Sequence, residues 1–135
     1  MRKVTGIALA LTCLALSGGC GGGDKVEVEG TVSYDGKPVP AGAISFLSSD
    51  AKSGGSGGAA IIDGKYHVPV KEGLKPGNYK VEIHWAKPTG KKFKSESGDT
   101  LDMTEEGLPE KYNQKSELKA EVKPGPNPVD FHLPK

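Results

Sequence analysis

The chain has few of the residues that build covalent cross-links or aromatic binding sites. It has two cysteines, Cys13 and Cys20, so the long remainder of the chain has no disulfide framework and no thiolate metal site. Aromatic residues make up 6% of the 135 residues, with Trp85 as the single tryptophan. The formal net charge is +1, which gives no electrostatic case for nucleic-acid binding.

A long apolar run is also missing. The uncharged stretch from Val4 to Leu16 is shorter than the about 20 residues that a transmembrane helix needs. It follows Arg2 and Lys3 and leads to small residues before Cys20, which is the order of a bacterial export signal. The sequence therefore predicts an exported protein.

The segment Leu16-Ser17-Gly18-Gly19-Cys20 resembles the lipobox of bacterial lipoproteins, with its leucine one place early. We expect residues 1–19 to be a lipoprotein signal peptide, and residues 20–24 to be a lipidated Cys20 with a Gly-rich tether. Acyl chains on Cys20 would hold residues 25–135, as one domain, on the outer membrane or the periplasmic face of a membrane. The alternative is an ordinary signal peptide cleaved near Gly18, with Cys20 incidental.

Glycine and proline are abundant, at 20 and 10 residues. Both are poor helix formers, so a helical bundle is disfavoured and short elements joined by turns are expected. Period-two alternation between turn signals predicts seven strands. They cover residues 25–32, 43–47, 58–62, 65–70, 79–85, 116–123 and 129–133.

The clearest alternation places Tyr79, Val81, Ile83 and Trp85 on one face of a strand. Asp35-Gly36 and Asp63-Gly64 predict tight turns, because both central residues must tolerate positive φ. The polar residues 48–58 are expected to be a flexible loop, residues 87–107 a long loop without apolar period, and residues 108–113 a short irregular or one-turn piece. Strands with one apolar face each are stable when two sheets press those faces together, which predicts an all-β, seven-stranded antiparallel β-sandwich.

Three stretches in this order resemble the carboxypeptidase regulatory-like domain, also described as transthyretin-like or prealbumin-like. They are Gly30-Thr31-Val32 with Asp35-Gly36-Lys37-Pro38-Val39-Pro40-Ala41-Gly42-Ala43-Ile44, then Asp63-Gly64-Lys65-Tyr66-His67-Val68, then Leu74-Lys75-Pro76-Gly77-Asn78-Tyr79-Lys80-Val81. The stretch Leu108-Pro109-Glu110-Lys111-Tyr112-Asn113 looks like the small secreted lipoproteins of planctomycete bacteria. The resemblance implies a transthyretin-like or immunoglobulin-like sandwich on an exported protein, and it implies no reaction.

Candidate chemistry is sparse. His67, His84 and His132 fall on outward-facing strand positions, and no two of them are close in sequence, so we expect exposed surface histidines and no metal site. Convergence across neighbouring strands stays open. The acidic residues between 99 and 106 lack the dense spacing of a calcium loop.

Catalytic motifs are also missing. There is no G-x-S-x-G elbow, and the chain does not end in the Tyr-Arg-Gly-Ser tetrapeptide of the related hydroxyisourate hydrolases. A Lys–Asn isopeptide bond would need Lys25 and Asn127 to be buried together, and both are expected at strand ends. We therefore expect a non-enzyme without cofactors. A metal-dependent hydrolase, which would need the histidines to converge, is the alternative from another class.

The expected work of the protein is structural or protein-binding, as a monomer in the envelope. We expect partner contact on the loop over residues 87–107, at Lys91, Lys92, Phe93 and Lys94, and at Tyr112. The lysines could touch anionic lipid, but neutralisation by the adjoining acidic run is favoured. A carbohydrate-binding module is the alternative, with the rings of Tyr34 and Tyr112 as its exposed candidates.

Overall fold

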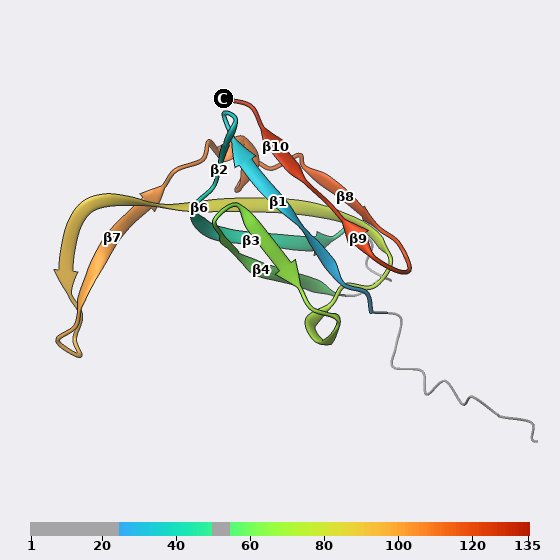
Figure 1. Cartoon of the computed structure of the whole chain (residues 1–135), viewed down its shortest axis with the longest axis horizontal. Helices are drawn as coiled ribbons and strands as arrows, with labels where there is room; N and C mark the ends of the chain where they lie inside the picture. Colours follow the sequence, from blue (N-terminus) through green and yellow to red (C-terminus); the bar gives the residue numbers. More distant parts are fainter. Residues whose placement is uncertain (1–24, 50–54) are drawn as a thin grey trace, which may run out of the picture.

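The computed structural model describes residues 25–49 and 55–135, and they form an almost entirely β fold (Figure 1). The expected signal peptide, Cys20, the tether and residues 50–54 lie outside the described residues. The strands are β1 (Val28–Tyr34), β2 (Lys37–Pro38), β3 (Ala41–Ser48), β4 (Ser56–Ile62), β5 (Lys65–Val68), β6 (Gly77–Lys94), β7 (Thr100–Glu106), β8 (Lys119–Val122), β9 (Asn127–Pro128) and β10 (Phe131–Leu133). Two 3₁₀ turns, η1 (Val70–Glu72) and η2 (Glu110–Tyr112), complete the described elements.

Hydrogen bonds join the strands into one sheet with the order β10-β1-β5-β4-β3-β6-β7. The short strands β2 and β9 pair with β1, and β8 pairs with β6. Most neighbours are antiparallel, but β1 runs parallel to β9 and β10, with Val32 opposite Phe131. The all-β prediction is confirmed, whereas a purely antiparallel arrangement is wrong. Parallel neighbours need a long connection, and nearly the whole described chain lies between β1 and β10.

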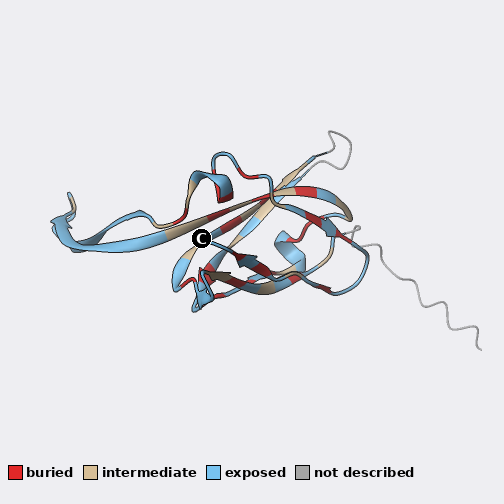
Figure 2. Ribbon diagram, turned by 90° about the horizontal axis from the view of Figure 1, so that it is seen from above, coloured by how far each residue is buried: buried red, intermediate tan, exposed pale blue. Residues whose placement is uncertain are grey.

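One core lies inside the curved sheet, and it draws side chains from strands that are not neighbours. Val28 and Val32 of β1 belong to the same buried cluster as Tyr79, Val81 and Ile83 of β6. The predicted alternation in these strands is therefore confirmed. Figure 2 shows the resulting alternation of buried and exposed positions along the strands of the body. Trp85, the last member of the β6 face, is half-buried and packs against the edge of the core.

Both Asp-Gly turns have the conformation that the sequence predicts. Asp35 and Gly36 have φ of 50° and 74°, and Asp63 and Gly64 have φ of 50° and 75°. The strands around the second turn pair directly, with Ile62 opposite Lys65. Aspartate and glycine tolerate this left-handed backbone, which matches the twist of a two-residue hairpin. The expected short piece at residues 108–113 is also present, as η2.

The prediction of a long loop over residues 87–107 is wrong. β6 continues to Lys94, and β7 pairs back along it, so the segment is a two-stranded hairpin that projects from the body (Figure 1). Alternation of apolar and polar residues marks a strand only when one of its faces is buried. Both faces of this hairpin are exposed (Figure 2), so the sequence has no such signal there.

The packing around Gly30 explains why the Gly30-Thr31-Val32 motif begins with a glycine. A Cβ at this position would lie 1.8 Å from the carbonyl oxygen of Val129, so the chain before β10 can approach β1 only across a glycine. We expect Gly30→Ala to lower the free energy of unfolding by at least about 2 kcal/mol, because a backbone atom must move. Urea unfolding followed by tryptophan fluorescence measures the change.

Gly55→Ala is the matched control, since nothing lies within 4 Å of a Cβ there. Its unfolding free energy should stay within about 0.5 kcal/mol of the parent or rise slightly. Equal stability of the two variants would show that the approach at Gly30 does not constrain the fold.

Candidate functional site

The first candidate site is the projecting hairpin, which we call the arm and define as residues 86–106. Its two strands pair from Ala86 with Glu106 to Lys94 with Thr100, with a register shift between Pro88 and Lys92. The inner part of β6 pairs with β3 over residues 79–85 and with β8 over residues 77–80, whereas the outer part pairs, among the described residues, with β7 alone. The arm therefore presents two open strand edges.

One face of the arm carries three large apolar side chains. Phe93 and Leu101 are directly opposite each other, and Met103 follows Leu101 at the next position on the same face of β7. They are 47%, 46% and 42% exposed. Exposed phenylalanine, leucine and methionine in one row form an apolar surface that is available for contact.

Ion pairs cross the arm between its strands. Lys87 Nζ lies 3.8 Å from Glu105, and Lys92 Nζ lies 3.5 Å from Asp102. The expected neutralisation of the basic run by the acidic run is thus confirmed for these two pairs. All four residues are at least half-exposed, so each pair contributes at most about 1 kcal/mol.

The arm is held to the body at the carboxylate of Glu106. Its oxygen atom Oε1 accepts hydrogen bonds from the backbone amides of Trp85 and Leu108, both at 3.0 Å, while Oε2 lies 2.7 Å from Nδ1 of His84. Burial by itself raises the pKa of Glu106, but the two amides and the His84 ring together outweigh it and lower that pKa. The ionised carboxylate is therefore the form that holds the base of the arm.

Gly107 brings the return strand against the tryptophan ring. A Cβ at Gly107 would lie 2.5 Å from the indole of Trp85, and the Gly107 amide donates to the Trp85 carbonyl at 2.9 Å. On another side, Tyr34 packs on the indole with a ring-centre distance of 6.3 Å. The indole Nε1 is buried without a hydrogen-bond partner among the described residues. Trp85 thus occupies the corner where the arm leaves the core.

Tyr112 is buried, although the sequence predicts an exposed ring. It is 6% exposed and donates its hydroxyl to the carbonyl of Pro134, so its expected exposure is wrong. The neighbouring Asn113 is buried as well, and its side-chain amide donates to the carbonyls of Leu108 and Pro109. Tyr112 packs edge-on to Tyr34, so these two rings form no open platform on which a sugar could stack.

The three histidines lie on outward positions, as predicted, and they do not converge. His67 pairs with Glu27, His84 pairs with Glu106, and Nδ1 of His132 lies 2.9 Å from the Ser33 hydroxyl. The expected contact residues Lys91, Lys92, Phe93 and Lys94 are all exposed on the arm, but strand β6 places Phe93 on the face opposite to Lys92 and Lys94.

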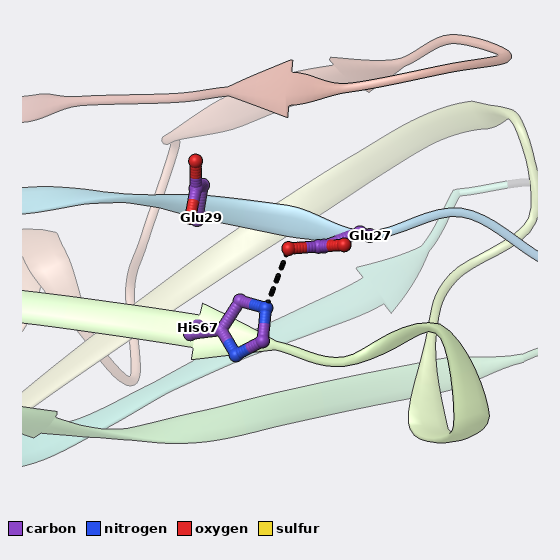
Figure 3. Close-up of side chains that lie close together, drawn as sticks. All are labelled: Glu27, Glu29 and His67. Carbon is purple, nitrogen blue, oxygen red and sulfur yellow. Dashed lines mark hydrogen bonds and ion pairs between the residues drawn. The ribbon is translucent and has the colours of Figure 1, made fainter.

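A second cluster gathers around His67. Glu27 and Glu29 stand on the same side of the chain at the start of β1, and Glu29 is the direct cross-strand partner of His67 in β5. One ligand atom from each of the three side chains lies within 4.8 Å of those of the other two. Figure 3 shows Glu27 and His67 joined by a hydrogen bond, with Glu29 beside them on the strand. Sequence reasoning missed this set because its members are about forty residues apart and meet only through strand pairing.

The cluster opens onto a shallow depression of about 700 Å³ between β1 and β5, whose lining includes Glu29, Tyr66, His67 and Asp130. Burial, and then the negative charge of Asp130, raise the pKa of Tyr66 far above its usual range. Its hydroxyl therefore stays protonated and donates to the Val129 carbonyl at 2.6 Å. The hydrogen bond to Val129 holds Tyr66 in place as a wall of the depression.

Comparisons with known proteins identify no family: neither a scan against protein-family models nor a search of curated proteins gives a match. Within residues 25–49 and 55–135, no helix is long and apolar enough to cross a membrane.

The Glu106 contacts predict that acid loosens the base of the arm. Because the pKa of Glu106 is lowered in the folded state, the stabilisation is complete above the pKa of an unfolded glutamate. It is lost as the pH falls through the lowered value. We expect the Trp85 and Leu108 amides to lose hydrogen-exchange protection over that acidic window.

Glu106→Gln should abolish this pH dependence and cost about 1–3 kcal/mol at neutral pH, since charge-assisted hydrogen bonds are lost. Glu105→Gln is the matched control, because the one side-chain contact of Glu105 within the described part of the chain is an exposed ion pair with Lys87. If Glu105→Gln changes the two amides as much as Glu106→Gln does, the assignment to Glu106 is wrong.

Proposed function

We propose that the chain is a non-enzymatic, lipid-anchored protein of the cell envelope that binds a protein partner through the arm. The observation that supports this best is the row of Phe93, Leu101 and Met103 on a hairpin that stands clear of the body (Figure 2). The arm adds no side chain to the buried cluster, so the stability of the core does not require it.

The arm suits a protein partner for two physical reasons. Aromatic residues and methionine are enriched in protein interfaces. The ion pair of Glu105 with Lys87 adds charge beside the apolar row, because Glu105 follows Met103 at the next position on the same face of β7. Its open edges also offer unpaired backbone groups, to which an extended segment of a partner can add as a strand.

The body supports the arm as a rigid base. We propose that it is a seven-strand sandwich of the carboxypeptidase regulatory-like type, to which the minor strands and the arm are additions. The support is the order of the three matching stretches, the two Asp-Gly turns with positive φ, and the core shared by β1 and β6. The absence of catalytic motifs in the sequence supports a binding role.

The lipid anchor generates its own test. Cys20→Ala should leave the precursor unprocessed or release the protein from membranes, because the thiol that receives the lipid is gone. Membrane fractionation and metabolic labelling with a fatty acid measure the outcome. Cys13→Ala is the control and should behave as the parent. Normal membrane fractionation and labelling of the Cys20→Ala protein would contradict the proposed anchor.

The arm is tested by in-cell photo-cross-linking from a probe residue placed at position 101. We expect a discrete adduct that the additional double substitution Phe93→Ser with Met103→Ser reduces about tenfold, as expected from the loss of an apolar contact worth about 1.4 kcal/mol. Folding should be nearly unaffected, since both side chains are exposed.

Ile62 provides the matched control, because it is an apolar residue of the body that is 66% exposed. Ile62→Ser should leave the adduct from position 101 unchanged, and a probe at position 62 should give no adduct with that partner. An adduct that survives the double substitution would place the contact elsewhere.

A further inference from the structure

We propose that Glu27, Glu29 and His67 bind a divalent cation of the zinc class on the outer surface of the β1–β5 pair. This site is independent of the arm and of the proposed partner binding. Glutamate oxygens and an imidazole nitrogen are accepted zinc ligands, and three protein ligands leave a further position for water.

The ligand atoms are close to the spacing that a metal requires. Bonds of about 2.0–2.2 Å at tetrahedral angles separate two ligand atoms by roughly 3.3–3.6 Å. Here the three atoms lie within 4.8 Å of one another, and His67 Nε2 is 2.7 Å from Glu27 Oε1. A cation between them needs the Glu27–His67 pair to open by less than 1 Å. It also needs Glu29 to close in by at most about 1.5 Å, and both movements are within reach of side-chain rotation.

The charge of the cluster also favours a cation. Glu27 lies just before β1 and Glu29 within it, and the ligand atoms of their two carboxylates are within 4.8 Å of each other, where like charges repel. Among the described residues, Glu27 has its one ion pair with His67, and Glu29 has none. A bound divalent cation would neutralise both carboxylates, whereas a single His67 proton can neutralise only one.

The backbone that carries the three ligands is fixed from both sides. Glu29 accepts a hydrogen bond from the Val129 amide at 2.8 Å, while its other neighbour is His67 of β5. Val26, just before the cluster, donates to the Leu74 carbonyl at 2.8 Å. His67 itself lies between Tyr66 and Val68, both buried in the core. On such strands the backbone is already in place, so binding has to order only the three exposed side chains.

The set of ligands selects the kind of ion. An imidazole favours zinc and related transition metals over magnesium and calcium, which prefer oxygen ligands alone. With one imidazole and two carboxylates, we expect zinc to bind more tightly than manganese, and manganese more tightly than magnesium.

His84 gives the structure a built-in control. Its Nδ1 lies 2.7 Å from Glu106, the same separation as in the His67–Glu27 pair, and both imidazoles are about half-exposed. The described residues bring no second carboxylate into a metal-binding group with His84. If a histidine–glutamate pair were enough to bind zinc, the two sites would respond alike.

The test is a zinc chloride titration of the full chain, followed by the ¹H–¹⁵N signals of its imidazole rings. The chain has three histidines, so His67→Gln, His84→Gln and His132→Gln assign every signal. We expect the His67 signals to shift at a zinc concentration that leaves His84 and His132 unchanged. Magnesium chloride at the same concentration should shift none of them.

Glu29→Gln is the decisive variant, because it removes a proposed ligand and leaves the hydrogen bond between His67 and Glu27 in place. It should weaken the zinc response of His67 at least about tenfold, as the loss of metal-site residues does elsewhere. Glu106→Gln should leave that response unchanged. An unaltered response in Glu29→Gln, no response of His67, or an equal response of His84 would each overturn the proposal.

Discussion

The structure depends on one strand, β6, which is buried in the core in its inner half and exposed to solvent in its outer half. In its inner half, Tyr79, Val81 and Ile83 are fully buried, and neighbours on both sides hydrogen-bond the backbone. In its outer half, the same backbone continues into solvent, and β7 is the one strand that pairs with it within residues 25–49 and 55–135. The buried half fixes the direction of the strand, so the exposed half leaves the body at a defined angle. A two-stranded hairpin is only marginally stable by itself, and here it is stabilised by the packing of β6 in the core.

The junction between the two halves is where packing and charge meet. Trp85 closes the core on one side of the junction, and Glu106 binds the backbone on the other. Gly107 lets the return strand lie directly on the indole. These contacts explain why both strands of the arm can be exposed while the base of the arm is held to the body.

The sequence predicts the body of the fold because its strands are half-buried. Val28 and Val81 are buried and alternate with charged residues, and the Asp-Gly turns require a backbone that few other residue pairs tolerate. The arm could not be predicted this way, because no buried face imposes a pattern on residues 87–106. The burial of Tyr112 could not be predicted either. Its segment is rich in polar residues and packs on the core through a few side chains, which have no regular spacing in the sequence. The Glu27–Glu29–His67 cluster depends on the register of β1 with β5, which a single sequence does not specify.

The arm has one further property, which concerns symmetry. Its β6 border carries Lys87, Lys91, Lys92 and Lys94, whereas its β7 border carries Asp102, Glu105 and Glu106. Two copies related by a twofold axis would have to place like borders together, lysine beside lysine or carboxylate beside carboxylate, and such neighbours repel. A contact between unlike borders has no such repulsion, but it repeats head to tail and does not close. The charge order of the arm therefore opposes a closed pair of identical chains through its edges, and it leaves both borders open to a different protein.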